Sequence, residues 1–196
     1  ITDELKIEGA AINIGKHSAN NISKEVSLVI YNQAIDKNNL ELKKARSLGI
    51  NAYSYPEAVG ELAKAYKTIA VAGSHGKSTT TALISLILIE AGFDPTVIIG
   101  TKLKEFGNSN FRKGRSKWLI IAADEWKASF LYYFPAVAVI TNIDKEHLDF
   151  YKNFSNIKKS FKQFKKQCGA VLERPKSAAT AKKIKSVLKI SGEHNI

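Results

Sequence analysis

The chain has 196 residues, of which 44% are apolar, and a formal net charge of +12. This length suits one large or two small domains, and the composition is that of a globular protein rather than a disordered or collagen-like one. No apolar run reaches the roughly 18 residues that a membrane-spanning helix needs, and the first ten residues are polar and mixed, unlike a secretory signal. The single cysteine, Cys168, excludes an internal disulfide and fits the reducing cytoplasm. The chain contains no Met, so we expect its native start to precede Ile1.

The positive charge does not by itself indicate a nucleic-acid partner. Much of the excess lies between Lys152 and Lys189, where lysines fall at helical spacing beside Ile157, Phe161 and Phe164. That pattern is typical of the solvated face of an amphipathic helix. Because no run of five basic residues and no nucleic-acid motif occurs, we expect no nucleic-acid partner, and we expect the charge to attract anionic nucleotides instead.

The first 66 residues alternate helices with short apolar strands, which predicts βαβ units and a parallel sheet. The helix over 38–48 has Asn38 or Asn39 as its expected cap and Gly49 as its stop. The expected elements in chain order are a helix end at 2–8, a strand at 11–15, a loop at 16–23, a strand at 26–31, a helix at 38–48, a strand at 50–53 and a helix at 56–66.

The stretch KTIAVAGSHGKSTTTALISLILIEAG, residues 67–92, organises the rest of the chain. Residues 68–72 predict a buried strand, 73–78 a glycine-rich turn, and 79–91 a buried helix. A strand, such a turn and a helix form a phosphate cradle, because the glycines admit the anion and free N–H groups face it. Val71 stands where the full phosphate-loop pattern has glycine, so this is the shortened form G-x-x-G-K-[ST]. A capped helix N-terminus is the alternative interpretation.

A second array of strands and helices follows this loop. The expected elements are a strand at 96–99, a long loop or hairpin at 102–117, a strand at 118–123, a helical segment at 127–133, a strand at 136–140, a helix at 154–167, a strand at 170–172 and a helix at 177–188.

Polar residues follow three of the apolar strands, at Gly73, Asp124 and Thr141. In an open parallel sheet, ligands bind outside the carboxyl ends of the strands, so we expect these ends to converge on one crevice. Phosphates bound at this edge would concentrate negative charge, which calls for a cation. The candidate ligands or water-positioning groups are Ser78, Asp124, Glu125 and His147. A helix-start cap at Asp124 and Glu125 and a surface position for His147 are the alternatives.

Two stretches, AGSHGKSTTTALI and VAVITNIDKEHLDFY, closely resemble signatures of the Mur ligase family, and VIYNQAI, NNLELKKARSLGI and the terminal SGEHNI are similar to further parts of it. The resemblance implies an α/β fold of three-layer parallel-sheet domains. Residues 1–66 would be a partial Rossmann-like domain that holds the UDP substrate, and residues 67–196 the central ATP-binding domain. The family's C-terminal, amino-acid-binding domain is expected to be missing.

The resemblance also implies roles, cofactors and partners. It implies ATP and Mg²⁺ as cofactors, UDP-N-acetylmuramate and L-alanine as substrates, a cytoplasmic setting, no membrane, and a monomer or weak dimer. His147 and Ser78 would ligate the metal, Asp149 would contact substrate, and Lys77, Asp124 and Glu125 would be catalytic. The residues expected to bind ATP are Gly73, Ser74, His75, Gly76, Lys77, Ser78, Thr79, Asn142, His194 and Asn195.

The sequence departs from the family at several positions. Ala122 stands where the resemblance places a metal-binding glutamate, and Trp126 and Lys127 replace Ser and Asp. Either this form is inactive or Asp124 compensates, since residues 122 and 124 point to the same side of a strand. The span from residue 169 to the terminus is also shorter than in the family, which suggests absent residues between about 170 and 190. A non-catalytic nucleotide-binding module and a ligase for recycled murein tripeptide remain alternatives.

Overall fold

The computed structural model describes residues 2–173. The chain divides into two compact units between Ala58 and Val59, within helix α3 (Tyr55–Ala63). The sequence instead predicts a domain boundary at 66/67, and that boundary stays a prediction. Within residues 2–173, every helix is too short or too polar to span a bilayer.

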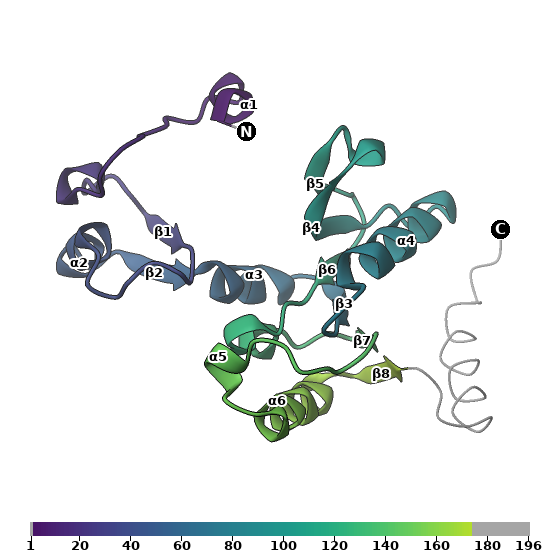
Figure 1. Ribbon diagram of the computed structural model, residues 1–196. Coiled ribbons are helices and arrows are strands. Elements are labelled where there is room, and N and C mark those ends of the chain that lie inside the picture. Colours follow the sequence, from purple (N-terminus) through teal and green to yellow (C-terminus); the bar gives the residue numbers. More distant parts are fainter. Residues whose placement is uncertain (1, 174–196) are drawn as a thin grey trace, which may run out of the picture. The chain divides into compact units, whose positions relative to one another are not determined.

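The first unit is built around a two-stranded parallel sheet. Leu28 pairs with Asn51 at one end of the two strands and Tyr31 pairs with Ser54 at the other. Figure 1 shows helix α2 beside this sheet. The elements are α1 (Thr2–Ile7), the 3-10 helix η1 (Ala19–Asn21), β1 (Leu28–Tyr31), α2 (Leu40–Ser47), β2 (Asn51–Ser54) and the start of α3.

Helix α2 begins and ends where the sequence predicts. The Asn39 side chain accepts hydrogen bonds from the backbone N–H groups of Glu41 (2.9 Å) and Leu42 (3.4 Å), which satisfies two donors of the first turn. Gly49 follows the helix with φ +71°, a conformation that glycine adopts without strain. Leu42 and Ala45 are buried.

The strand predicted at 11–15 is wrong. These residues follow α1 without forming a strand, and none of the described residues pairs with them in a ladder. Apolar character alone does not make a strand, because its backbone groups need a neighbouring strand to bond.

The second unit is a six-stranded sheet in the order β5-β4-β6-β3-β7-β8. All neighbouring strands are parallel except the β4–β5 pair. This pair is a hairpin that begins at Thr96, earlier than the loop or hairpin expected at 102–117. The strands are β3 (Lys67–Ala72), β4 (Thr96–Leu103), β5 (Ser109–Arg112), β6 (Trp118–Ala122), β7 (Val137–Ile140) and β8 (Ala170–Glu173). The helices are α4 (Lys77–Glu90), η2 (Lys104–Phe106), η3 (Trp126–Tyr132), α5 (Leu148–Tyr151) and α6 (Phe154–Gln167).

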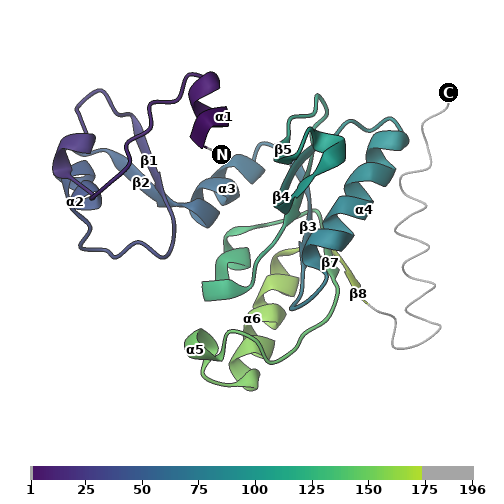
Figure 2. The same ribbon diagram turned by 45° about the horizontal axis from the view of Figure 1, so that its top comes forward.

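Helices cover both faces of this sheet, as Figures 1 and 2 show. Leu119 and Ile121 of β6 face a core that contains Phe130 of η3 and two phenylalanines of α6, whereas Ile120 faces α4. This alternation is what a strand buried on both faces produces. The fold is therefore the three-layer α/β arrangement that the sequence predicts. The helix predicted at 177–188 lies outside the described residues.

Asp94 fastens the β4–β5 hairpin to the loop that precedes β4. One carboxylate oxygen accepts a hydrogen bond from Arg112 Nη2 (2.6 Å), and the other accepts from the backbone N–H (3.0 Å) and Nε (3.2 Å) of Arg115. The hydrogen bond from Arg112, followed by those from Arg115, lowers the pKa of Asp94 to about 2.

Candidate functional site

The glycine-rich turn between β3 and α4 is shaped by its glycines. Gly73 has φ +137°, and a Cβ at this position would lie 2.1 Å from Thr141 Oγ1. Gly76 is the N-cap of α4, with φ +76° and no side-chain cap. The first turn of α4 therefore presents its N–H groups and the positive end of the helix dipole beside the turn, an arrangement suited to anions.

The segment after β7 holds this turn in place. The Asn142 amide accepts a hydrogen bond from the His75 N–H (2.9 Å) and donates one to the His75 carbonyl (3.0 Å). The Thr141 hydroxyl donates to the same carbonyl at 2.7 Å, and the Asp144 N–H donates to Ser74 Oγ at 2.9 Å. Sequence reasoning expects Asn142 to bind ATP, whereas the structure shows its amide supporting the loop.

Lys77 links the turn to the end of β6. Its ammonium group donates to the carbonyls of Gly73 (2.8 Å) and Ser74 (3.3 Å) and to Glu125 Oε2 (2.7 Å). Asp124 Oδ1 is 3.8 Å from the same nitrogen. The structure thus brings together the three residues that the sequence predicts to be catalytic.

Glu125 is a buried carboxylate with one unsatisfied oxygen. The residue is 1% exposed, and Oε1 has no hydrogen-bond partner in the part of the chain that the structure describes. His147 Nε2 lies 3.8 Å from this oxygen. Burial raises the pKa of Glu125, and the hydrogen bond from Lys77 opposes that shift.

Asp124, Glu125 and His147 form a group whose ligand atoms lie within 4.8 Å of one another. Two carboxylates and an imidazole are suitable ligands for a divalent cation. The unsatisfied Oε1 of Glu125 gives independent support, because a buried oxygen without a donor is costly unless something else satisfies it. The described residues therefore fit a divalent cation.

Sequence reasoning missed Tyr151, which contacts this group through the backbone. Its hydroxyl donates to the Glu125 carbonyl at 2.6 Å, and its N–H donates to the His147 carbonyl at 2.9 Å. Tyr151 is 5% exposed, and burial raises its pKa. Its spacing of four residues from His147 in a helical segment was the available signal, but the contact with Glu125 depends on the tertiary fold.

The other predicted site residues lie on helices α4 and α5 or outside the described residues. Ser78 Oγ lies 3.5 Å from where a Cβ on Gly100 would stand, and Thr79 is exposed on the first turn of α4. Asp149 is exposed on α5 and is not one of the clustered ligands. His194 and Asn195 lie outside the described residues.

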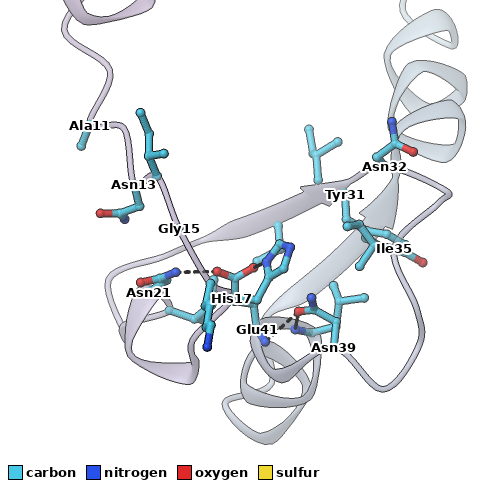
Figure 3. Close-up of a pocket in the computed structure, with 16 residues that line it drawn as sticks. Ala11, Asn13, Gly15, His17, Asn21, Tyr31, Asn32, Ile35, Asn39 and Glu41 are labelled. Carbon is cyan, nitrogen blue, oxygen red and sulfur yellow. Dashed lines mark hydrogen bonds and ion pairs between the residues drawn. The ribbon is translucent and has the colours of Figure 1, made fainter. Parts of the chain in front are cut away.

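The first unit has a separate cavity of about 640 Å³, shown in Figure 3. On its wall, Glu41 Oε2 pairs with His17 Nδ1 (2.5 Å) and Oε1 accepts from Asn21 Nδ2 (2.6 Å). The hydrogen bond from Asn21 is the main cause that lowers the pKa of Glu41. The lining also includes Tyr31 and Asn32, in the domain where the resemblance implies the UDP substrate.

Two family models match consecutive parts of the chain. Residues 1–67 match the model described as Mur ligase family, catalytic domain, and residues 71–195 match the Mur ligase middle domain. The chain is 48% identical over 163 residues to a UDP-N-acetylmuramate–L-alanine ligase of Aquifex aeolicus, and 46% identical over 165 residues to one of Caldanaerobacter subterraneus. These matches cover 83% and 84% of the chain but 35% of each relative, so the chain spans about a third of their length.

The fold of the chain also matches the folds of solved structures. The crystal structure of a UDP-N-acetylmuramate–alanine ligase from Thermotoga maritima matches with a TM-score of 0.79 and 26% identity, covering 92% of this chain and 42% of that one. A UDP-N-acetylmuramate:L-alanyl-γ-D-glutamyl-meso-diaminopimelate ligase of Neisseria meningitides matches with a TM-score of 0.77 at 20% identity, over 94% of this chain and 63% of that one, which indicates a shared fold. Because the middle-domain model alone matches more than half of the residues, the chain belongs to the Mur ligase family.

Proposed function

We propose that the protein is an ATP-dependent ligase that joins L-alanine to the carboxylate of UDP-N-acetylmuramate in peptidoglycan synthesis. The substrate carboxylate would attack the γ-phosphate of ATP to form an acyl phosphate and ADP. The amine of L-alanine would then attack the acyl carbon and release orthophosphate. The names of the relatives support the substrates. The observation that supports the chemistry most directly is the ion pair between Lys77 and the buried Glu125 beside the glycine turn.

Each part of the site has a role in this proposal. The amides of residues 76–79 would bind the phosphates, since those of Ser74 and His75 donate to Asn142. Lys77 would exchange its loop carbonyls for phosphate oxygens, offsetting their charge. Asp124, Glu125 and His147 would hold Mg²⁺, with Ser78 as a further ligand from the start of α4. A bound Mg²⁺ would supply charge neutralisation at the phosphates.

The remaining predicted site residues would contact the substrates. Asp149 would contact the sugar acid, and His194 and Asn195 the adenine, as the resemblance implies. The cavity beside Tyr31 and Asn32 would hold the UDP end. We further propose a cytoplasmic monomer or weak dimer without nucleic-acid or membrane partners. The half-buried Cys168, whose pKa is raised by desolvation to about 11, is consistent with an unreactive thiol.

Ala122 favours a second candidate, a nucleotide-binding module without turnover. The side chain at this position has no metal-binding atom. We favour the ligase because Asp124, Glu125 and His147 form a cation group that needs no ligand from position 122.

Calorimetry and an ADP-release assay separate the two candidates. The full-length protein is titrated with ATP and Mg²⁺ and then with UDP-N-acetylmuramate, and ADP is measured after adding L-alanine. ADP release that depends on both substrates supports the ligase. Binding of both without ADP release supports the module, and Ala122→Glu then tests whether the missing carboxylate is the cause. Absence of ATP binding would contradict both candidates.

A further inference from the structure

One residue contacts the backbone of both Glu125 and His147. The Tyr151 hydroxyl donates to the Glu125 carbonyl (2.6 Å), and the Tyr151 N–H donates to the His147 carbonyl (2.9 Å). These two residues come from different loops, 22 positions apart in the chain. Among residues 2–173, Tyr151 is therefore a direct bridge between the loop after β6 and the loop after β7.

Both loops have a backbone that other residues must hold in place. His147 has φ +54°, and Lys127 and Ala128, just after Glu125, have φ +49° and +58°. The backbone of a residue other than glycine is strained in this left-handed region, and such strain persists only where the surrounding structure holds the residue in place. The Glu125 carbonyl accepts from Ala128 N–H at 2.9 Å as well as from Tyr151.

We propose that Tyr151 is the positioning residue that fixes the separation of Glu125 and His147, and thereby sets the affinity of this site for a divalent cation. The inference rests on the proposed function, because it takes Asp124, Glu125 and His147 as the cation ligands. Positioning of this kind matters because ligands fixed at the right separation need little rearrangement when the ion binds.

The surroundings of the phenol suit a fixed donor. The ordinary pKa of tyrosine is about 10 and burial raises that of Tyr151 further, so its hydroxyl is protonated and can donate at neutral pH. Asn156 of α6 donates to the Tyr151 carbonyl at 2.8 Å, which anchors α5 to α6. Ser160 Oγ is the second neighbour of the hydroxyl, at 3.4 Å.

The test is a Mn²⁺ titration of the chain, in which electron paramagnetic resonance measures the free ion. Tyr151→Phe keeps the ring and removes the donor, and we expect the Kd for Mn²⁺ to rise about tenfold, the lower end of what outer-shell changes cause. Tyr133→Phe is the matched control, since Tyr133 is equally buried at 5% in the same core but lies before the amino end of β7. The control should change the Kd less than twofold. ATP affinity in EDTA should be unchanged in both variants.

Asn156→Ala gives a second measurement if Tyr151→Phe fails to fold. It removes the anchor of α5 and leaves the hydroxyl, and we expect a smaller rise in Kd, about threefold. Glu125→Gln tests the cation site itself and should abolish saturable Mn²⁺ binding. An unchanged Kd in Tyr151→Phe and Asn156→Ala, with loss in Glu125→Gln, would overturn the role of Tyr151 alone. Wild-type affinity in Glu125→Gln would overturn the cation site and this inference with it.

Discussion

Lys77 Nζ and Glu125 Oε2 lie 2.7 Å apart, although the two residues are separated by 48 positions in the chain. The pair joins the first residue of α4 to the turn after β6, because β3 and β6 are adjacent parallel strands that end at the same edge of the sheet. Glu125 is almost fully buried and Lys77 is 19% exposed, so water screens this pair less than a surface ion pair.

Replacing Lys77 should weaken ATP binding. In Lys77→Met we expect the Kd for ATP with Mg²⁺ to rise by at least tenfold, because the ammonium group that faces the phosphates is lost. Isothermal titration calorimetry measures the change. Lys67→Met is the control, since Lys67 lies at the opposite end of β3 with its ammonium group over the Trp118 ring. Equal losses in the two variants would contradict a specific role for Lys77.

The two glycines of the turn should respond differently to alanine. Gly73→Ala places a Cβ 2.1 Å from Thr141 Oγ1, whereas a Cβ at Gly76 would meet no atom within 4 Å among residues 2–173, its own chain neighbours and helix backbone aside. We expect Gly76→Ala to cost about 1–2 kcal/mol from its left-handed backbone alone, and Gly73→Ala to cost more and to abolish ATP binding. Urea unfolding and calorimetry check both effects. A Gly73→Ala variant as stable as Gly76→Ala would show that the loop can move away from Thr141.

The stability of the metal-free chain should depend on pH through Glu125. Its folded pKa is raised by burial, so the folded state holds the proton more tightly than the unfolded state, where the pKa is about 4.3. The stabilising contribution is therefore fully present below about pH 4.3 and is lost as pH rises through the folded pKa. The free energy of unfolding of Glu125→Gln, measured in urea from pH 4 to 7, should lack this decrease. Parallel curves for the two proteins would contradict the shift.

The contribution of Asp94 to the free energy of unfolding should depend on pH in the opposite direction. Its folded pKa of about 2 is below the ordinary value of about 3.9, so its contribution is present above that value and is lost as pH falls towards 2. Asp94→Asn should lower the free energy of unfolding at pH 7, and its difference from the wild type should shrink between pH 4 and pH 2. A difference that stays constant over this range would mean that the carboxylate charge does not stabilise the hairpin.

Local signals predicted most elements of the fold. Asn39 and Gly49 mark the ends of α2, and the glycine turn after β3 follows from the sequence pattern alone. The strand at 11–15 could not be judged from local sequence, because a strand depends on a partner elsewhere in the chain.

The candidate site was predicted only in part, because some of its contacts depend on partners far away in the chain. The phosphate-loop motif predicts Lys77, and the rule that polar strand ends converge predicts Asp124 and Glu125 near it; the structure places the three together. The contact of Tyr151 with Glu125 and the use of both polar atoms of Asn142 on His75 are tertiary relationships that no local pattern encodes. The roles of these residues in binding remain predictions.

The bonds from Asn142 and Thr141 to the glycine turn limit how the turn could be transplanted. Residues 73–78 keep their shape through donors and acceptors supplied by residues 141–144, nearly 70 positions away. A graft of the six-residue turn onto another strand–helix junction would lose that scaffold, even with every glycine retained. The smallest unit that could be transferred with this turn intact is therefore strands β3 and β7 together with the segments that follow them, residues 73–78 and 141–144.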